Sequence, residues 1–155
     1  MCASTGFFIV SVPADGHCLF HALVKEGHAG GDDYRALRHK VVTELKRDWD
    51  TYRLYLAAEP AGTIGADQIG ETFDMEVYCA EMLKDKYGGM TEVRALCNLL
   101  RVHIVVTQST GQHEDFSPEL FSAATPVVRL SFHHYLWRGP HFNLLRGPLP
   151  VFVDE

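Results

Sequence analysis

Residues 13–23 read PADGHCLFHAL, and this stretch decides how the rest of the sequence is interpreted. Asp15 and Gly16 are residues typical of turns. The apolar spacing that follows predicts a helix that begins at Cys18 and runs to about Glu26. The sequence therefore places a thiol where a turn becomes a helix, with a histidine on each side of it.

A cysteine in this position favours nucleophilic chemistry, because the thiolate is the reactive form. Free backbone N–H groups at a helix N-terminus stabilise negative charge, and so does a histidine that takes up the proton. The amides from Gly16 to Cys18 are also placed to stabilise an oxyanion. Two alternatives remain: Cys18 packs as a small apolar residue, or it binds zinc with His17 or His21, although no second compact ligand pair is evident.

The base that such a cysteine needs has to be chosen among nine histidines. His141 differs from the others because it begins a predicted strand and is followed two residues later by Asn143. Strand residues two apart point to the same face. The amide is then able to accept a hydrogen bond from the imidazole and set its tautomer. The residues alone favour His141 without excluding the others.

Length and composition are those of one globular domain, residues 1–155. The net charge of −6 argues against a broad nucleic-acid surface. No apolar run reaches the roughly 18–20 residues of a membrane span, and the first residues lack the basic region of a secretory signal. Four widely spaced cysteines predict reduced thiols in an intracellular compartment.

The hydrophobic pattern predicts an α+β fold in which a small central β-sheet is flanked by helices. We expect His133 and His134 in a solvated connection between the last two strands. The expected strands are residues 7–12, 102–108, 127–132 and 141–146, and the first of them is expected to be buried. The expected helices are residues 18–26, residues 34–56 as one amphipathic helix, residues 72–86, and a further helix after the Gly88–Gly89 turn. Residues 60–70 are an expected loop.

Three blocks of sequence, taken in order, resemble the ovarian-tumour (OTU) family of papain-like cysteine proteases. They are DGHCLFHAL at 15–23, EVYCAEMLKDKYGGMTEVRAL at 76–96 and HFN at 141–143. Together they frame the chain from about Phe7 to Leu145. A lone DGxC motif is weak, whereas three ordered blocks are specific. The resemblance implies a papain-like OTU fold.

By this resemblance, Cys18 is the nucleophile, His141 is the general base and then the acid, and Asn143 orients the imidazole. Asp15, the fourth candidate catalytic residue, shapes the loop that supplies the oxyanion-hole amides and is a second candidate for orienting the catalytic groups. Further candidates for substrate binding are Gly16, His17, Gly88, Gly89 and Trp137. Two of these interpretations have alternatives. Instead of binding substrate, Gly88 and Gly89 would form only a turn between helices. Trp137 either lines the channel for the substrate's tail or packs as a cap over the strand.

The implied activity is hydrolysis of isopeptide bonds after the C-terminal glycine of ubiquitin, and the implied partners are ubiquitin, polyubiquitin or a ubiquitin-like modifier. The resemblance implies no metal or cofactor, no nucleic acid, no membrane association and a cytoplasmic monomer. The alternatives are an OTU-fold module that binds ubiquitin without cleaving it, and a papain-like hydrolase of another acyl group. Candidate rims of the binding site are residues 60–70, 111–117 and 133–139, since binding loops border rigid scaffolds.

The sequence departs from the family pattern at two places. Asn143 stands where many members have aspartate; it accepts a hydrogen bond but lends the imidazolium no negative charge. The middle block reads YGGM where the family often has Trp-Gly-Gly-Glu, so that Tyr87 keeps an aromatic ring and Met90 removes a carboxylate. The second departure bears on loop geometry rather than on the chemistry.

Overall fold

The computed structural model describes residues 8–12, 16–58, 74–84, 86–108, 110–135 and 139–146. Asp15, Trp137 and the expected loop at 60–70 lie outside these described residues. In chain order, the elements are β1 Phe8–Val10, α1 Cys18–Lys25, α2 Tyr34–Arg47, α3 Trp49–Ala58, α4 Met75–Leu83, α5 Met90–Leu100, β2 His103–Gln108, β3 His113–Phe116, β4 Val127–Tyr135 and β5 Gly139–Arg146.

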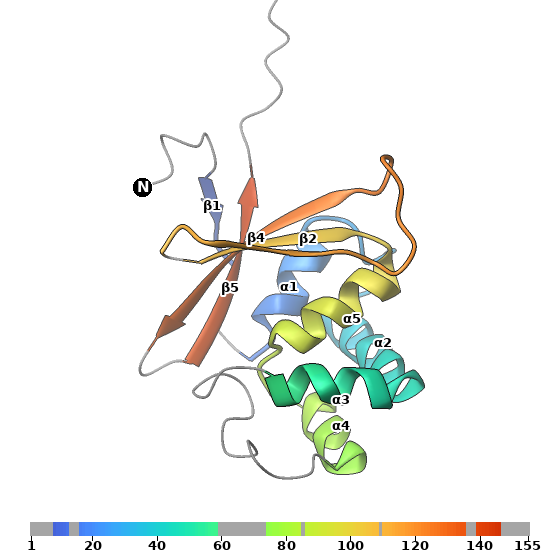
Figure 1. Ribbon diagram of the computed structural model, residues 1–155. Helices are drawn as coiled ribbons and strands as arrows, with labels where there is room; N and C mark the ends of the chain where they lie inside the picture. Colours follow the sequence, from blue (N-terminus) through green and yellow to red (C-terminus); the bar gives the residue numbers. More distant parts are fainter. Residues whose placement is uncertain are drawn as a thin grey trace, which may run out of the picture.

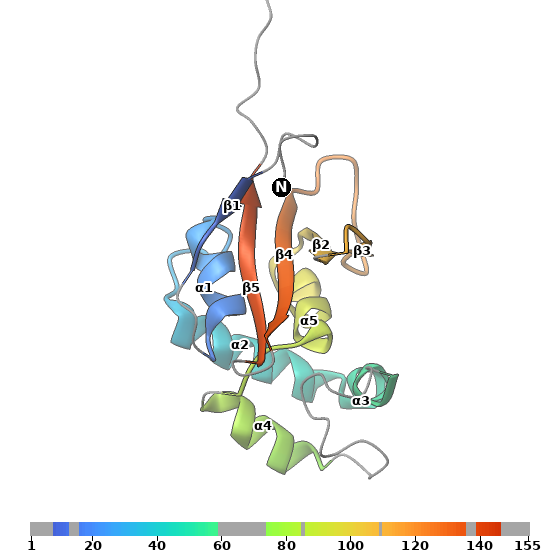
Figure 2. The ribbon, with the colours of Figure 1, turned by 90° about the vertical axis from the view of Figure 1, so that its left-hand side faces the viewer.

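The strands form one mixed five-stranded sheet in the order β1-β5-β4-β2-β3. Strands β2 and β4 pair in parallel, and the other neighbours are antiparallel. The helices lie on one side of this sheet, with α1 beside β5 and β1, and with α3 and α4 at the far end of the helical layer (Figures 1 and 2). This arrangement confirms the predicted α+β class.

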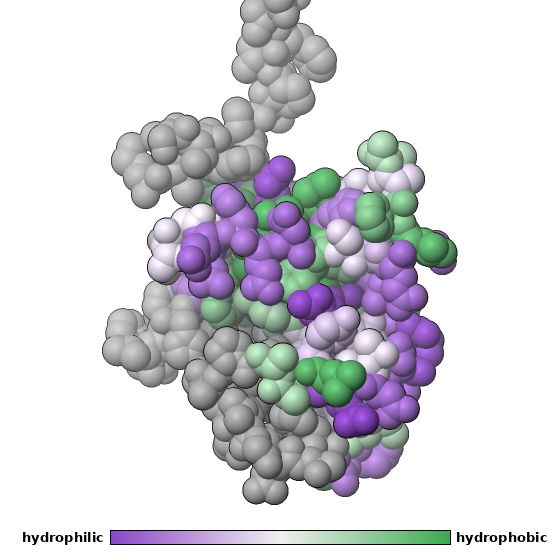
Figure 3. Space-filling view, in the orientation of Figure 1, coloured by the Kyte–Doolittle hydropathy of each residue, from purple (hydrophilic) through white to green (hydrophobic). Residues whose placement is uncertain are grey.

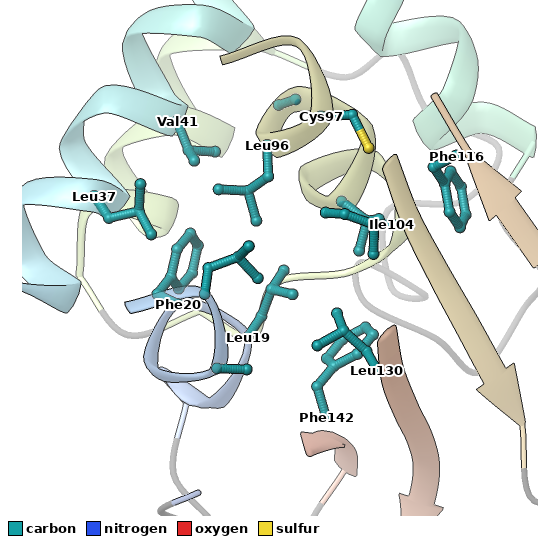
Figure 4. Packing of buried hydrophobic residues seen from close by; sticks show 14 of the residues in the cluster. Leu19, Phe20, Leu37, Val41, Leu96, Cys97, Ile104, Phe116, Leu130 and Phe142 are labelled. Atoms are coloured by element: carbon teal, nitrogen blue, oxygen red, sulfur yellow. The ribbon is translucent and has the colours of Figure 1, made fainter. Parts of the chain in front are cut away.

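The core lies between the helices and the sheet, and the helix that carries Cys18 is at its centre. Leu19 and Phe20 of α1 point into the same region as Leu37 of α2, Leu96 of α5 and Phe142 of β5 (Figure 4). These five side chains are fully buried. Burial of a side chain of this size contributes roughly 1.5–3 kcal/mol. The apolar side of α1 therefore fixes the position of its first residue.

The single helix expected over residues 34–56 is wrong, because the chain breaks at Asp48. Asp48 has φ −137° and ψ 50°, which is not helical. Its carbonyl oxygen accepts the N–H groups of Thr51 and Tyr52 at 3.0 and 3.1 Å. Asp48 thus ends α2 and begins α3. Periodicity alone misses such a break because both helices bury apolar faces in the same core.

The strands differ from expectation in three ways. Phe8 and Ile9 are exposed rather than buried, because β1 is an edge strand that pairs with β5 alone. Strand β3 lies inside the expected loop at 111–117, and its sequence HEDF lacks the apolar alternation that marks a strand. Strand β4 continues to Tyr135, which places His133 and His134 in the strand rather than in a connection.

The face shown in Figure 3 is mostly polar where it is described, with apolar side chains gathered over the connection between β3 and β4. Leu120, Phe121 and Val127 are the large exposed apolar residues of that region. Within the described segments, no helix combines the length and the apolar character needed to cross a membrane.

We expect Leu19→Ala to lower the free energy of unfolding by about 2–5 kcal/mol, because it opens a cavity where α1 meets the sheet and α2. The matched change Leu120→Ala, at a side chain that is 76% exposed, should alter it by less than about 0.5 kcal/mol. Denaturant unfolding of both variants measures the difference. Equal effects of the two changes would contradict this core.

Candidate active site

Cys18 meets the last strand of the sheet. It is the first residue of α1 and is 1% exposed. Its Sγ accepts a hydrogen bond from the backbone N–H of Phe142 at 3.4 Å. The ladder between β1 and β5 ends at the pair Val10 and Leu144. The edge of β5 beyond that pair is therefore open to the N-terminus of α1, and the sulfur lies next to the strand that carries His141.

His141 and Asn143 of β5 form the second half of the site. The ring Nε2 of His141 is 2.9 Å from the amide Oδ1 of Asn143, and both residues are 7% exposed. The backbone N–H of Val12 donates to the same oxygen at 3.0 Å. A backbone N–H only donates, so the atom between them is the amide oxygen, which only accepts. Nε2 therefore carries a proton, and in the neutral ring Nδ1 is the basic nitrogen.

The described cysteines differ in their surroundings. Burial raises the pKa of Cys79, and it raises the pKa of Cys97 to about 12. Cys18 instead begins a helix, where the dipole favours negative charge. Its sulfur also accepts an N–H, and a hydrogen bond to the charged form stabilises that form. Among the described thiols, this one has the environment of a nucleophile.

His133 of β4 is paired directly with His141 on the neighbouring strand β5. Directly paired residues of neighbouring strands point to the same face. Burial lowers the pKa of His133, and the positive charge of His141 lowers it further. The residue is half-buried beside the candidate base, so the expectation of a solvated His133 is wrong. The extension of β4 past residue 132 is the reason.

Arg38 is the residue of this site that the sequence reasoning missed. It is 1% exposed, and its guanidinium donates to the carbonyl oxygen of Gly16 at 2.7 Å and lies 2.9 Å from Nδ1 of His17. Both are residues of the loop that precedes Cys18. A signal was present, because Arg38 stands between Leu37 and Val41 on the apolar face of α2. A cation on such a face needs buried acceptors.

Gly88 and Gly89 lie beneath the site rather than at its surface. A Cβ on Gly88 would come within 2.7 Å of Leu19 Cδ2, so the turn packs directly on α1. The N–H of Gly89 donates to Glu92 Oε1 at 2.7 Å, and Tyr78 donates to the other oxygen of this buried carboxylate. These contacts support the alternative in which the two glycines form a packed turn between helices.

Asp15 and Trp137 belong to the parts of the chain that are not described, and their roles stay predictions. Among the described residues, no three side chains of the His, Cys, Asp or Glu type are grouped so that they could hold a metal ion. The described part of the site thus consists of a thiol, an imidazole, an amide and the loop held by Arg38.

The chain is similar to a known protein family and to several known proteins. A family model described as OTU-like cysteine protease matches residues 13–142. Ubiquitin thioesterase otu2 of Schizosaccharomyces pombe is 27% identical over 144 residues, which cover 90% of this chain and 45% of that protein. OVARIAN TUMOR DOMAIN-containing deubiquitinating enzyme 6 of Arabidopsis thaliana is 25% identical, over 94% of this chain and 25% of that protein. The chain spans less than half the length of these two relatives.

Solved structures show the same fold. The OTUD1 OTU domain superposes with a TM-score of 0.64 at 19% identity, covering 92% of this chain and 87% of that domain. An OTU deubiquitinase from Wolbachia pipientis wMel, solved bound to ubiquitin, superposes with a TM-score of 0.62 at 16% identity, covering 92% of this chain and 97% of that one.

The lowered pKa of His133 predicts a pH dependence of stability. Below the ordinary value of 6.5, the unfolded chain binds a proton that the folded protein resists. The free energy of unfolding should therefore fall as the pH falls from about 7.5 to about 5.5. His133→Gln should flatten this dependence, as measured by denaturant unfolding at each pH.

His39→Gln is the control for this measurement, because His39 is exposed on α2. It should keep the slope of the wild-type protein. If His133→Gln and wild type lost stability in parallel, His133 would not be held in its neutral form by the fold.

Proposed function

Because the chain belongs to the family of OTU-like cysteine proteases, we propose that it hydrolyses isopeptide bonds after the C-terminal glycine of ubiquitin or a ubiquitin-like modifier. The observation that carries the proposal is the meeting of Cys18 with β5, through the Phe142 N–H, beside the hydrogen-bonded pair His141 and Asn143. The names of relatives that include deubiquitinating enzymes support it, as does an OTU domain solved in complex with ubiquitin.

In this proposal, Cys18 is the nucleophile and His141 moves the proton. Nδ1 of His141 takes the thiol proton, and the sulfur attacks the carbonyl carbon of the terminal glycine. A C–S bond forms, and the C=O electron pair becomes an oxyanion. When the oxyanion collapses, the C–N bond breaks and the lysine amine leaves with the proton from Nδ1. A thioester with Cys18 and a free lysine side chain result.

Water completes the reaction. It attacks the thioester carbonyl and gives one proton to His141. The C–S bond then breaks, the Cys18 sulfur recovers this proton from His141, and the modifier leaves as a carboxylic acid that ionises to the carboxylate. Throughout the reaction, Asn143 Oδ1 accepts a hydrogen bond from the Nε2–H of His141 and keeps Nδ1 directed at the reacting atoms. Since an amide is neutral, Asn143 orients the imidazolium without the added charge stabilisation of an aspartate.

The oxyanion forms next to the N-terminus of α1. The first N–H groups of a helix point out of its N-terminal end and have no partner within the helix. The amides of His17 and Cys18 are thus placed to donate to the oxyanion, as the loop sequence predicts. We propose that Asp15 also shapes this loop, and that Trp137 borders the channel for the modifier's tail.

We propose ubiquitin, polyubiquitin or a ubiquitin-like modifier as the partner and a monomeric enzyme that acts inside the cell, in the cytoplasm. The thiols of Cys18, Cys79 and Cys97 are reduced, which supports a reducing compartment. The net charge of −6 suits a modifier with a basic tail.

A ubiquitin probe that carries a thiol-reactive group at its C-terminus tests the proposal. We expect the wild-type protein to form a covalent adduct, visible as a mass increase of one ubiquitin, and Cys18→Ala to form none. Cys79→Ala is the matched control and should react like wild type, because burial keeps that thiol protonated. Differently linked diubiquitins then show which bonds are cleaved.

Two outcomes would contradict the proposal. Reversible binding of ubiquitin by both wild type and Cys18→Ala, with no adduct in either, would make the protein a binding module. An adduct that persists in Cys18→Ala would place the nucleophile elsewhere.

A further inference from the structure

We propose that Arg38 is a positioning residue that holds the peptide between Gly16 and His17 in the orientation that directs the His17 N–H at the oxyanion. The proposal rests on the function proposed above and deepens it. Arg38 is 1% exposed, and its guanidinium donates to carbonyl groups of the chain itself. It acts through the loop that precedes the nucleophile.

The guanidinium of Arg38 ties three segments of the chain together. Nη2 donates to the carbonyl of Gly16 at 2.7 Å, and Nη1 donates to the carbonyls of Met82 and Lys86 at 2.7 and 2.8 Å. Met82 lies in α4, and Lys86 lies in the link that leads to α5. One face of the guanidinium rests on the ring of Phe20, at 4.3 Å from its centroid. Arg38 is therefore fixed from two sides before it reaches the loop.

Holding the Gly16 carbonyl also sets the direction of an N–H. The described chain has no cis peptide bonds, and in a trans peptide the C=O and the following N–H point in opposite directions. With the Gly16 oxygen on Arg38, the His17 N–H points away from Arg38. The next peptide is fixed as well, since the His17 carbonyl accepts the N–H of His21 at 2.9 Å in the first turn of α1.

The loop needs these hydrogen bonds because Gly16 does little to restrict its own backbone conformation. Glycine populates backbone regions that other residues avoid, so the peptide after it turns over at low cost. A turned peptide would present the Gly16 carbonyl to the oxyanion and remove a donor. Loss of one oxyanion-hole donor lowers kcat by roughly 10²–10³-fold in other hydrolases.

Contact with Arg38 also fixes the ring of His17. An arginine guanidinium only donates, so the His17 Nδ1 that lies 2.9 Å from Nη2 acts as the acceptor and carries no proton. The ring packs on Tyr34, with centroids 4.7 Å apart. The residue whose amide faces the oxyanion is thus held through its backbone and through its side chain.

Arg38→Lys is the decisive variant, because lysine keeps the charge but lacks the planar fork that reaches three carbonyls. Arg47→Lys is its matched control, since Arg47 lies on the same helix and pairs with Glu44 away from the site. Two acyl substrates are used: a fluorogenic amide of the ubiquitin C-terminus, and p-nitrophenyl acetate. A third reagent, chloroacetamide, alkylates Cys18 by displacing chloride at a saturated carbon, a step that forms no oxyanion.

We expect Arg38→Lys to lower kcat on both acyl substrates by about 10- to 100-fold, with KM for the ubiquitin amide unchanged. The rate of Cys18 alkylation, followed by mass spectrometry of its peptide, should stay within about twofold of wild type. Arg47→Lys should match wild type in every assay. All assays are run well below the unfolding midpoint of each variant.

Each other result overturns the proposal. An unchanged kcat in Arg38→Lys would show that the loop before Cys18 keeps its conformation without Arg38. An equal fall of kcat and of alkylation would place the effect on the thiolate. If Arg38→Lys and Arg38→Gln both lacked a cooperative unfolding transition, Arg38 would be required for the protein to fold at all. It would then not act specifically by positioning the loop.

The same assays separate the two proposals. A wild-type protein that hydrolyses p-nitrophenyl acetate through Cys18 but ignores ubiquitin substrates would contradict the proposed function, and Arg38→Lys would still be judged on the ester. A wild type that turns over neither substrate would contradict both.

Discussion

The structure depends on the contact between the N-terminus of α1 and the edge of β5. Strand β1 pairs with β5 only as far as Leu144. Beyond that point, two hydrogen bonds replace the ladder: the N–H of Val12 reaches the side chain of Asn143, and the N–H of Phe142 reaches the sulfur of Cys18. Residues separated by more than 120 positions in sequence thus share one site. Without this contact the thiol and the imidazole belong to unrelated parts of the chain.

Buried polar groups hold the segments around this contact. Arg38 binds carbonyls of three segments. Glu92 accepts the N–H of Gly89 and the hydroxyl of Tyr78. A buried charge without partners is costly, so each of these groups fixes the backbone that supplies its partners. Arg38 lies beside the loop before Cys18, and Glu92 lies beside the turn before α5.

A comparable cluster of Glu44, Arg47 and Tyr52 lies at the other end of α2. Burial raises the pKa of Glu44, but hydrogen bonds from Arg47 and Tyr52 outweigh it, and the net pKa is lowered. Burial together with the bond to Glu44 raises the pKa of Tyr52. This cluster joins α2 to α3 where the chain breaks at Asp48. Shifted pKa values are therefore not confined to the surroundings of Cys18.

Sequence reasoning located the elements that carry the site, because local signals mark them. The turn before Cys18, the helix after it, and the apolar strand with His141 and Asn143 all have short-range patterns. Features that depend on neighbours distant in sequence were not predictable. The exposure of β1 follows from its place at the sheet edge, β3 forms by pairing with β2, and the role of Arg38 appears only once three carbonyls converge on it.

The tautomer of His141 tests the account most directly. In Cys18→Ala, ¹⁵N–¹H correlation spectra of the imidazole at a pH where the ring is neutral should show the proton on Nε2, the nitrogen that faces Asn143 Oδ1. With Asn143→Ala added, the ring should lose this preference. A proton on Nδ1 in Cys18→Ala would mean that the imidazole turns its basic nitrogen away from the position of the sulfur, and it would contradict the site described above.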